Sequence, residues 1–362
     1  MRMCHTKSMR NGWILLMCAA GLAQSQPPPD ASKQDKDAVI RVQANVVIAP
    51  TTVRNRGGSF VSGLQLQDFE LYDNNKVQRI TADVQGEPLS LVVAVQKSYN
   101  MDQILPKIQR IGPLVTNLVA GQDGEVALIA FDHRIQVVQD FTNETTKLST
   151  ALKNIKPGSP NHAVIDAEMA AIRMLRTRPR DHRRVLLLVA EKRDRGSEAH
   201  VREALTEAEF ANVTIFSVDI SSLVATLTGT PIPPPPPSIP TTAQHIPAGG
   251  AQTPTTIDQN YYNGNYIPVF VDIFKAVKSI FIDDTLDVFT RFTGGKQYSF
   301  VSERSLDRAI EGIGEELHGQ YLLSYVPNNL AEGGFHEIRV VVNRPSLEVR
   351  TRPGYWVATR TD

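Results

Sequence analysis

The chain has 362 residues, of which 41% are hydrophobic and 21% charged, as in an ordinary globular protein of one or two domains. Its 38 basic residues balance its 38 acidic residues, so no excess of positive charge indicates a nucleic-acid partner. After the first residues, no segment is long and apolar enough to predict a membrane span.

Residues 1–25 have the pattern of a secretory signal peptide. Basic residues precede an apolar run at 13–23, and a small-x-small cleavage pattern follows at 23–25. The run is far shorter than the roughly 20 residues of a membrane span. Cleavage would remove both cysteines, Cys4 and Cys18, so we expect no disulfide in the mature chain. We therefore expect an exported protein that is periplasmic or secreted.

The first part of the expected mature chain combines a leader with β-strands. Residues 26–37 are rich in polar residues and proline, which predicts a flexible leader. Alternating apolar residues and glycine turns then predict strands between 38 and 84. The expected β segments are 38–48, 61–72 and 77–80. These strands are too few to close a β-sandwich by themselves.

Residues 88–318 alternate strands with helices, which predicts an α/β domain with a doubly wound, mostly parallel sheet. The expected strands are 91–95, 125–131, 135–138, 184–190, 213–218 and 297–301. The expected helices are 104–119, 145–153, 163–176, 197–210 with Ser197 as its cap, and 305–318, and a further α/β segment lies at 269–290. Strand 135–138 follows its predecessor too closely for a crossover, so we expect an antiparallel edge strand.

The α/β pattern is interrupted at 221–268 by a proline run at 233–237 and a stretch rich in Gly, Thr and Gln. Prolines this dense disfavour helix and sheet, and they predict a polyproline II or unstructured surface insertion. A docking strip for a partner that binds proline-rich segments is the alternative interpretation.

The tail at 319–358 is again rich in strand patterns, at 320–325, 337–342 and 347–350. We expect this tail and the strands of 38–84 to complete one small β-sandwich. Each piece alone would leave long unpaired edges, and pairing the two pieces removes them. The α/β domain would then be an insertion in a split all-β module.

Two motifs in these flanking β segments carry a family resemblance. The first is G-L-Q-L-Q-D-F-E-L-Y-D-N at 63–74, and the second is Y-L-L-S-Y-V-P at 321–327, with G-Y at 354–355. Together with T-R-F-T-G-G at 290–295, they resemble the VWFA-related proteins described from Acidobacteria, over residues 38–357 apart from the insertion. This resemblance implies a von Willebrand A-like domain that binds other proteins or matrix through its top face.

Small polar residues follow the apolar strand at 91–95. Gln96-x-Ser98-x-Asn100 occupies the frame of Asp-x-Ser-x-Ser, which holds a divalent cation in von Willebrand A domains. The same resemblance places the family's Thr at His162 and its final Asp at Glu191. Only Ser98 is retained unchanged. An amide lacks the charge that a hard cation prefers, so the chemistry departs from that of the family.

Three interpretations of this face follow. In the first, which we favour, the surface holds no metal and no cofactor. It either binds a protein, matrix or envelope ligand or is vestigial. In the second, His162 and Glu191 attract Zn²⁺ or Mn²⁺. In the third, Ser98, His162 and Glu191 are the triad of an envelope hydrolase, although Ser98 lies in no G-x-S-x-G elbow. We therefore expect a binding or scaffold protein that is not an enzyme.

Overall fold

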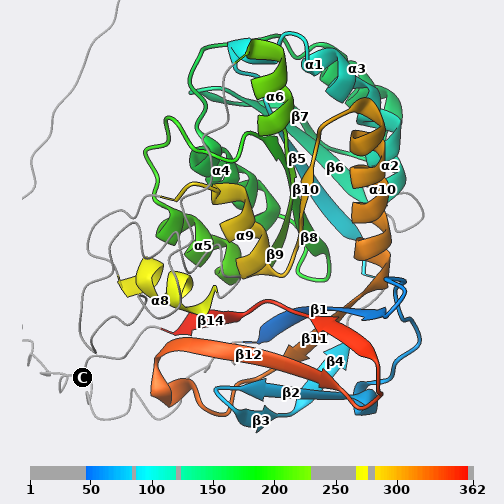
Figure 1. Ribbon diagram of the computed structural model, residues 1–362, viewed down its shortest axis with the longest axis vertical. Coiled ribbons are helices and arrows are strands. Elements are labelled where there is room, and N and C mark those ends of the chain that lie inside the picture. Colours follow the sequence, from blue (N-terminus) through cyan, green and yellow to red (C-terminus); the bar gives the residue numbers. More distant parts are fainter. Residues whose placement is uncertain (1–45, 84–86, 120–123, 230–265, 276–281, 358–362) are drawn as a thin grey trace, which may run out of the picture. The chain divides into compact units, whose positions relative to one another are not determined.

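The computed structural model describes residues 46–83, 87–119, 124–229, 266–275 and 282–357 (Figure 1). The expected signal peptide, the leader, the first part of strand 38–48 and the proline run lie outside these residues. Within the described part of the chain, no helix is long and apolar enough to cross a membrane.

A six-stranded sheet with the order β10-β9-β8-β5-β6-β7 forms the α/β part. Its strands are β5 (Leu89–Gln96), β6 (Glu125–Phe131), β7 (Ile135–Thr142), β8 (Arg183–Ala190), β9 (Val213–Asp219) and β10 (Gln297–Ser299). All neighbours are parallel except β7, which pairs antiparallel with β6 at the edge, as predicted. This order is that of a doubly wound, Rossmann-type sheet, so the predicted fold class is confirmed.

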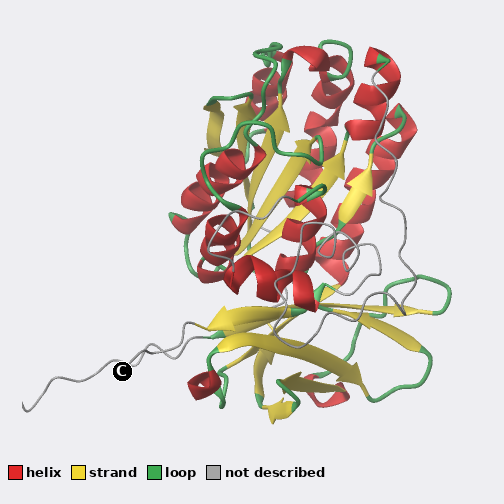
Figure 2. Cartoon of the chain, turned by 60° about the vertical axis from the view of Figure 1, so that its left-hand side comes forward, coloured by secondary structure: helices red, strands yellow, loops and turns green. Residues whose placement is uncertain are grey.

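Helices pack on both faces of this sheet (Figure 2). One face carries α1 (Leu105–Ile108), α2 (Gly112–Val119), α3 (Thr145–Lys153), α6 (Ser221–Thr228) and α10 (Glu303–Gly319). The other carries α4 (Val164–Arg176), α5 (Val201–Phe210), α8 (Ile267–Lys275) and α9 (Thr285–Thr293). Val93 and Val95 of β5 enter the first core, whereas Val92 and Ala94 enter the second. Successive side chains of a strand point to opposite faces, so a continuous apolar run fits a sheet covered on both sides.

The remaining strands form two four-stranded sheets, β13-β1-β11-β4 and β14-β12-β2-β3. Their bounds are β1 (Val47–Asn55), β2 (Phe69–Asp73), β3 (Lys76–Gln78), β4 (Ile80–Asp83), β11 (Gln320–Tyr325), β12 (Gly334–Val342), β13 (Leu347–Arg350) and β14 (Gly354–Val357). Strand β1 pairs antiparallel with β11, and β2 pairs antiparallel with β12. Each sheet therefore combines strands from both ends of the chain, and a third apolar core contains side chains of both sheets.

The motifs at 63–74 and 321–327 meet inside this sandwich, around the carboxylate of Asp73. Tyr325 and Tyr355 donate their hydroxyl hydrogens to Asp73 Oδ2, at 2.9 and 2.7 Å. His336 Nδ1 lies 2.7 Å from Asp73 Oδ1, and Asn329 Nδ2 donates to the same oxygen at 2.9 Å. Asp73 and His336 are fully buried. The structural role of these motif residues is to join the two halves of the sandwich.

Several predicted elements are corrected by the structure. Helix 104–119 is divided into α1, a 3₁₀ turn η3 (Gln109–Ile111) and α2. Pro113 has no N–H to donate to the carbonyl of Gln109, which explains the break. Segment 61–72 is strand only from Phe69, because a 3₁₀ turn η1 (Leu66–Asp68) precedes β2.

Ser197 does not cap α5, which begins at Val201 with His200 as its N-cap. The hydroxyl of Ser197 instead donates to Asp194 Oδ1 at 2.6 Å. Asp166 accepts the backbone N–H groups of the following residues, Glu198 and Ala199. Because carboxylates accept these N–H groups, residues 196–199 form an irregular bend instead of the first turn of a helix.

The predicted insertion at 221–268 begins too early. Residues 221–228 form helix α6, and Leu223 and Val224 are buried in the core on one face of the sheet. Helix α8 starts at Ile267, before the predicted end of the insertion. The prolines that suggested the insertion lie outside the described residues. The predicted boundary was wrong because it also included the apolar residues before them, which form α6.

The sandwich contacts the amino ends of the parallel strands. Arg183, at the start of β8, donates through Nη1 to the carbonyl of Leu317 in α10 and through Nη2 to Gln320 in β11. The carboxyl ends of β5, β8 and β9 lie at the opposite edge of the sheet (Figure 1). That edge holds all the candidate site residues.

Candidate functional site

The site lies at the topological switch point of the six-stranded sheet. From β5 the chain continues to β6 on one side, whereas from the adjacent β8 it continues to β9 on the other. Open α/β sheets bind ligands outside the carboxyl ends of the strands at this point. Gln96 is the last residue of β5, and Glu191 follows β8 directly.

The Gln96 side chain joins these two strand ends. Its Oε1 accepts the backbone N–H of Glu191 at 2.8 Å. A backbone N–H can only donate, so this bond fixes which end of the amide carries the oxygen. The Nε2 group therefore donates to Ser98 Oγ at 2.7 Å and to Glu191 Oε1 at 2.9 Å.

Asn100 closes the network into a ring. Ser98 Oγ donates to Asn100 Oδ1 at 2.6 Å, and Asn100 Nδ2 donates to Glu191 Oε1 at 3.2 Å. Gln96 and Ser98 are fully buried, and Glu191 is 8% exposed. The Glu191 carboxylate is thus held by two side-chain amide N–H groups in a water-poor position.

His162 completes the set of five predicted residues, at the loop before α4. Its Nε2 lies 2.9 Å from the backbone carbonyl oxygen of Arg193, so this nitrogen carries the hydrogen. Its Nδ1 lies 3.8 Å from Glu191 Oε1 and has no hydrogen-bond partner among the described residues. Burial lowers the pKa of His162, against the opposing effect of Glu191. The ring is therefore neutral at pH 7, with a lone pair on Nδ1.

The hydrolase hypothesis requires a bond from Ser98 to His162 and a second bond from His162 to an acid. In the structure, the Ser98 hydroxyl donates to Asn100, and His162 donates to the Arg193 carbonyl. The three residues of the hypothesis are neighbours, yet their hydrogen bonds lead to other partners. The described geometry does not form a proton relay.

The donor set does not fit a hard divalent cation. Such an ion accepts lone pairs from oxygen and favours several carboxylates. Here Gln96 directs two N–H bonds into the space between Ser98 and Glu191, where an ion would need oxygen atoms. Glu191 is the carboxylate of the network, and within the described ranges no cluster of three or more His, Cys, Asp or Glu side chains could hold a metal ion.

Asp132 is a further site residue that the sequence analysis did not single out. Burial opposes its charge, but backbone N–H groups of Ser159 and Arg134 and the ammonium of Lys97 lower its pKa to about 2. These groups lie 3.0, 2.7 and 3.2 Å from its carboxylate oxygens. Asp132 fixes the loops beside the site. It follows the apolar strand 125–131 directly, and that position could have indicated it.

Tyr99 was also missed, although it lies between two predicted residues. It belongs to the 3₁₀ turn η2 (Tyr99–Met101), and its side chain is 62% exposed. Val301, which follows the carboxyl end of β10, is 60% exposed. The edge of the sheet that carries the buried hydrogen-bond network therefore also presents large apolar groups to solvent.

Comparisons with known proteins yielded structural similarities only. No protein-family model and no curated protein matches the chain. Among solved structures, an aerotolerance-related membrane protein from Bacteroides fragilis matches with 15% identity and a TM-score of 0.37, over 63% of this chain and 99% of that chain. The conserved hypothetical protein BatB from Bacteroides thetaiotaomicron matches with 20% identity and a TM-score of 0.30, over 36% of this chain and 66% of that chain. The vWF domain of the pili tip protein Mfa5 from Porphyromonas gingivalis matches with 17% identity and a TM-score of 0.25, over 28% and 37% of the respective chains.

Proposed function

We propose that the protein is an exported binding or scaffold module that contacts a protein ligand through the carboxyl edge of its α/β sheet, without a bound metal and without catalysis. The observation that carries this proposal is the position of the Gln96 amide, which donates to both Ser98 and Glu191. These N–H groups bond Ser98 Oγ and Glu191 Oε1, two oxygen atoms that a cation would otherwise bind. The site is a degenerate metal site in which an amide replaces the ion.

The exposed side chains of this edge support a protein ligand. Tyr99 combines a large apolar ring with a polar hydroxyl, and tyrosine is among the residues that contribute most to protein interfaces. It is attached to the ring of hydrogen bonds through its neighbours Ser98 and Asn100, which limits its backbone freedom. A rigid aromatic anchor loses little conformational entropy on binding.

The metal-free character is tested by restoring the family's carboxylate. We expect Mg²⁺ and Mn²⁺ to leave the melting temperature of the native chain unchanged. In Gln96→Asp, a carboxylate replaces the N–H donors, and a metal at ten times its Kd should add about 1.4 kcal/mol of stability. The melting temperature should then rise by about 3–6 °C. Gln96→Asn is the matched control, because it has the same size without the charge.

A Mg²⁺-dependent rise in the native chain that disappears in Ser98→Ala would overturn the metal-free site. Zn²⁺ tests the second interpretation, which one observation favours: His162 Nδ1 is buried, unpartnered and close to Glu191. Imidazole and carboxylate suit zinc. A rise with Zn²⁺ that disappears in His162→Ala would replace the metal-free proposal with an altered metal site.

The surface itself is tested by capture from an envelope extract with the native chain and two alanine variants. Tyr99→Ala should reduce recovery of the captured ligand at least about tenfold, the effect of losing one central anchor. Phe210→Ala is the control, since Phe210 is 75% exposed and lies at the end of α5. Chelator should not change recovery. Equal losses in the two variants would contradict a binding role for this edge.

A further inference from the structure

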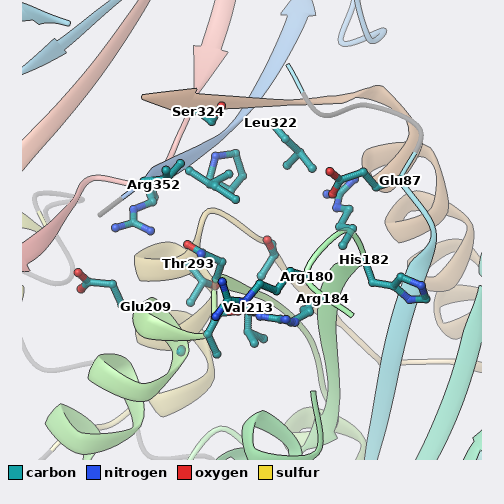
Figure 3. A pocket seen from close by; sticks show the side chains of 18 of the residues that line it. Glu87, Arg180, His182, Arg184, Glu209, Val213, Thr293, Leu322, Ser324 and Arg352 are labelled. Carbon is teal, nitrogen blue, oxygen red and sulfur yellow. Dashed lines mark hydrogen bonds between the residues drawn. The ribbon is translucent and has the colours of Figure 1, made fainter. Parts of the chain in front are cut away.

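A second candidate site lies at the amino ends of the parallel strands, at the end of the sheet opposite Gln96. A cavity of about 240 Å³ separates the amino ends of β8 and β9 from strands β1 and β11 of the sandwich (Figure 3). In Figure 3, Leu322 and Ser324 of β11 lie on one side of it, and Arg180 and Arg184 on the other.

The lining of this cavity is both apolar and cationic. Ile48, Leu322 and Phe292 contribute apolar surface. The charged lining residues are four arginines and two glutamates, which are Arg180, Arg183, Arg184, Arg352, Glu87 and Glu209. His182 also lines the cavity. The lining therefore has a formal excess of positive charge beside an apolar wall.

Arg184 is oriented by neutral acceptors. Its Nη1 donates to the Ala211 carbonyl at 2.9 Å, and its Nη2 donates to the Arg178 carbonyl at 3.0 Å. Its Nε is buried and has no acceptor among the described residues. Burial, reinforced by the charge of Arg180, lowers the pKa of Arg184. Carbonyl oxygens hold the guanidinium in place without neutralising it, so an incoming anion would relieve its cost of burial.

Arg352 provides a second cation on the sandwich side, and it is 5% exposed. Its Nε donates to the Gly354 carbonyl at 3.2 Å. Glu209, its acidic neighbour across the cavity wall, accepts the backbone N–H of Trp356 at 3.2 Å. Burial raises the pKa of Glu209, against the attraction of Arg352. Glu209 is thus a lining carboxylate held by the backbone of β14, and the four lining arginines outnumber it and Glu87.

We propose that this cavity binds a small organic acid, with its carboxylate at the arginines and an apolar body against Ile48, Leu322 and Phe292. Arg180 is exposed and lies at the rim, so its charge meets the ligand as it enters. The guanidinium groups favour a charged carboxylate, and the apolar residues Ile48, Leu322 and Phe292 favour an apolar chain.

The probes are hexanoate, hexanamide and hexylamine, titrated into the full chain by isothermal calorimetry. We expect saturable binding of one hexanoate per chain, with the amide at least about tenfold weaker, a difference of 1.4 kcal/mol, and the amine without measurable binding. Acetate should bind more weakly than hexanoate, because it lacks the apolar body. Equal binding of hexanamide and hexanoate, or no saturable binding of hexanoate up to about 10 mM, would overturn the proposal.

Arg180→Glu tests the site without disturbing a buried contact, since the side chain is exposed. It removes the positive excess of the lining and should weaken hexanoate about tenfold, with a smaller loss in Arg180→Gln. Arg173→Glu makes the same change on α4 outside the cavity lining and should have less than about a twofold effect. Circular dichroism establishes that each variant is folded. Folded Arg180→Glu with native affinity would show that the cavity does not bind the carboxylate.

Discussion

A single side chain determines the chemistry at the carboxyl edge of the sheet. With an aspartate at the end of β5, two carboxylates would face each other, and a cation would be needed between them. With Gln96, the amide Nε2 donates a hydrogen bond to the Glu191 carboxylate, and the amide Oε1 accepts the backbone N–H of Glu191. The hydrogen bonds of Gln96 thus connect the ends of β5 and β8 through groups of the chain itself.

Glu168 is another residue whose environment determines its chemistry. It is fully buried in α4, and neither of its carboxylate oxygens has a hydrogen-bond partner among the described residues. Burial raises its pKa well above the usual 4.5. The folded state therefore retains a proton that the unfolded state loses once the pH exceeds 4.5.

We expect this group to destabilise the fold progressively as pH rises above 4.5, the unperturbed value. Below that pH, Glu168 is protonated in both states and does not lower the free energy of unfolding. Between that pH and the raised pKa of the folded state, the unfolded state alone loses the proton, and the free energy of unfolding falls. Urea unfolding at several pH values should show native stability falling relative to Glu168→Gln as pH increases. The exposed Glu311→Gln is the control and should follow the native pH profile. If Glu168→Gln had the same dependence of stability on pH as the native chain, Glu168 would be ionised in the folded state.

At the scale of elements, Asp73 connects strands that are far apart in the chain. It lies at the end of β2 and receives hydrogen bonds from Tyr325 of β11 and Tyr355 of β14. It also contacts His336 of β12. One carboxylate thus joins strands of both sheets of the sandwich, which apolar packing alone would hold less specifically.

Asp73→Asn should cost about 3–5 kcal/mol, because it removes a buried charge and leaves its donors without an adequate acceptor. The measurement is urea unfolding followed by circular dichroism. Asp68→Asn, which changes an exposed ion pair with Arg344, should cost much less. Equal losses at the two positions would mean that the buried cluster adds no more than a surface pair.

At the scale of the whole molecule, Glu316 joins α10 to the sandwich. It is fully buried and forms ion pairs with Arg54 of β1 and Arg350 of β13. Thr52 donates to the same carboxylate at 3.0 Å. Trp356 of β14 makes a second connection, because its ring stacks on Phe274 of α8 with centroids 5.1 Å apart. The apolar neighbours of Trp356 belong to the α/β core, so it reports on the junction and not on the sandwich interior.

We expect the sandwich and the α/β part to unfold together for this reason. In the chain beginning at Gln26, Trp356 is the remaining tryptophan, and its fluorescence should change at the same urea concentration as circular dichroism. Glu316→Gln should lower both midpoints together, at a cost of about 3 kcal/mol. The exposed Glu315→Gln should leave both unchanged. Separate transitions in the native chain would contradict a cooperative unit.

The sequence alone was sufficient for elements whose pattern is local. Helix 145–153 and strands 125–131 and 320–325 have the predicted bounds, because an uninterrupted apolar period or run specifies each of them. Segments with mixed cues were misjudged. Ser197 resembled a helix cap, but hydrogen bonds to Asp194 and Asp166 hold residues 197–199 outside the helix. Helix α6 was predicted as part of the insertion because the prolines after it dominate the composition of that segment.

The sequence determined the alternation of strands and helices and the polar residue types at the strand ends, since both are properties of neighbouring residues. Only the tertiary structure decided how those residues bond. Gln96 and Glu191 are separated by 95 positions, and the pairing of β5 with β8 brings them within 2.9 Å. Likewise, Asp73 and Tyr355 are 282 positions apart. Periodicity reports which face of an element is buried, but hydrogen-bond partners depend on distances that only the packed sheets establish.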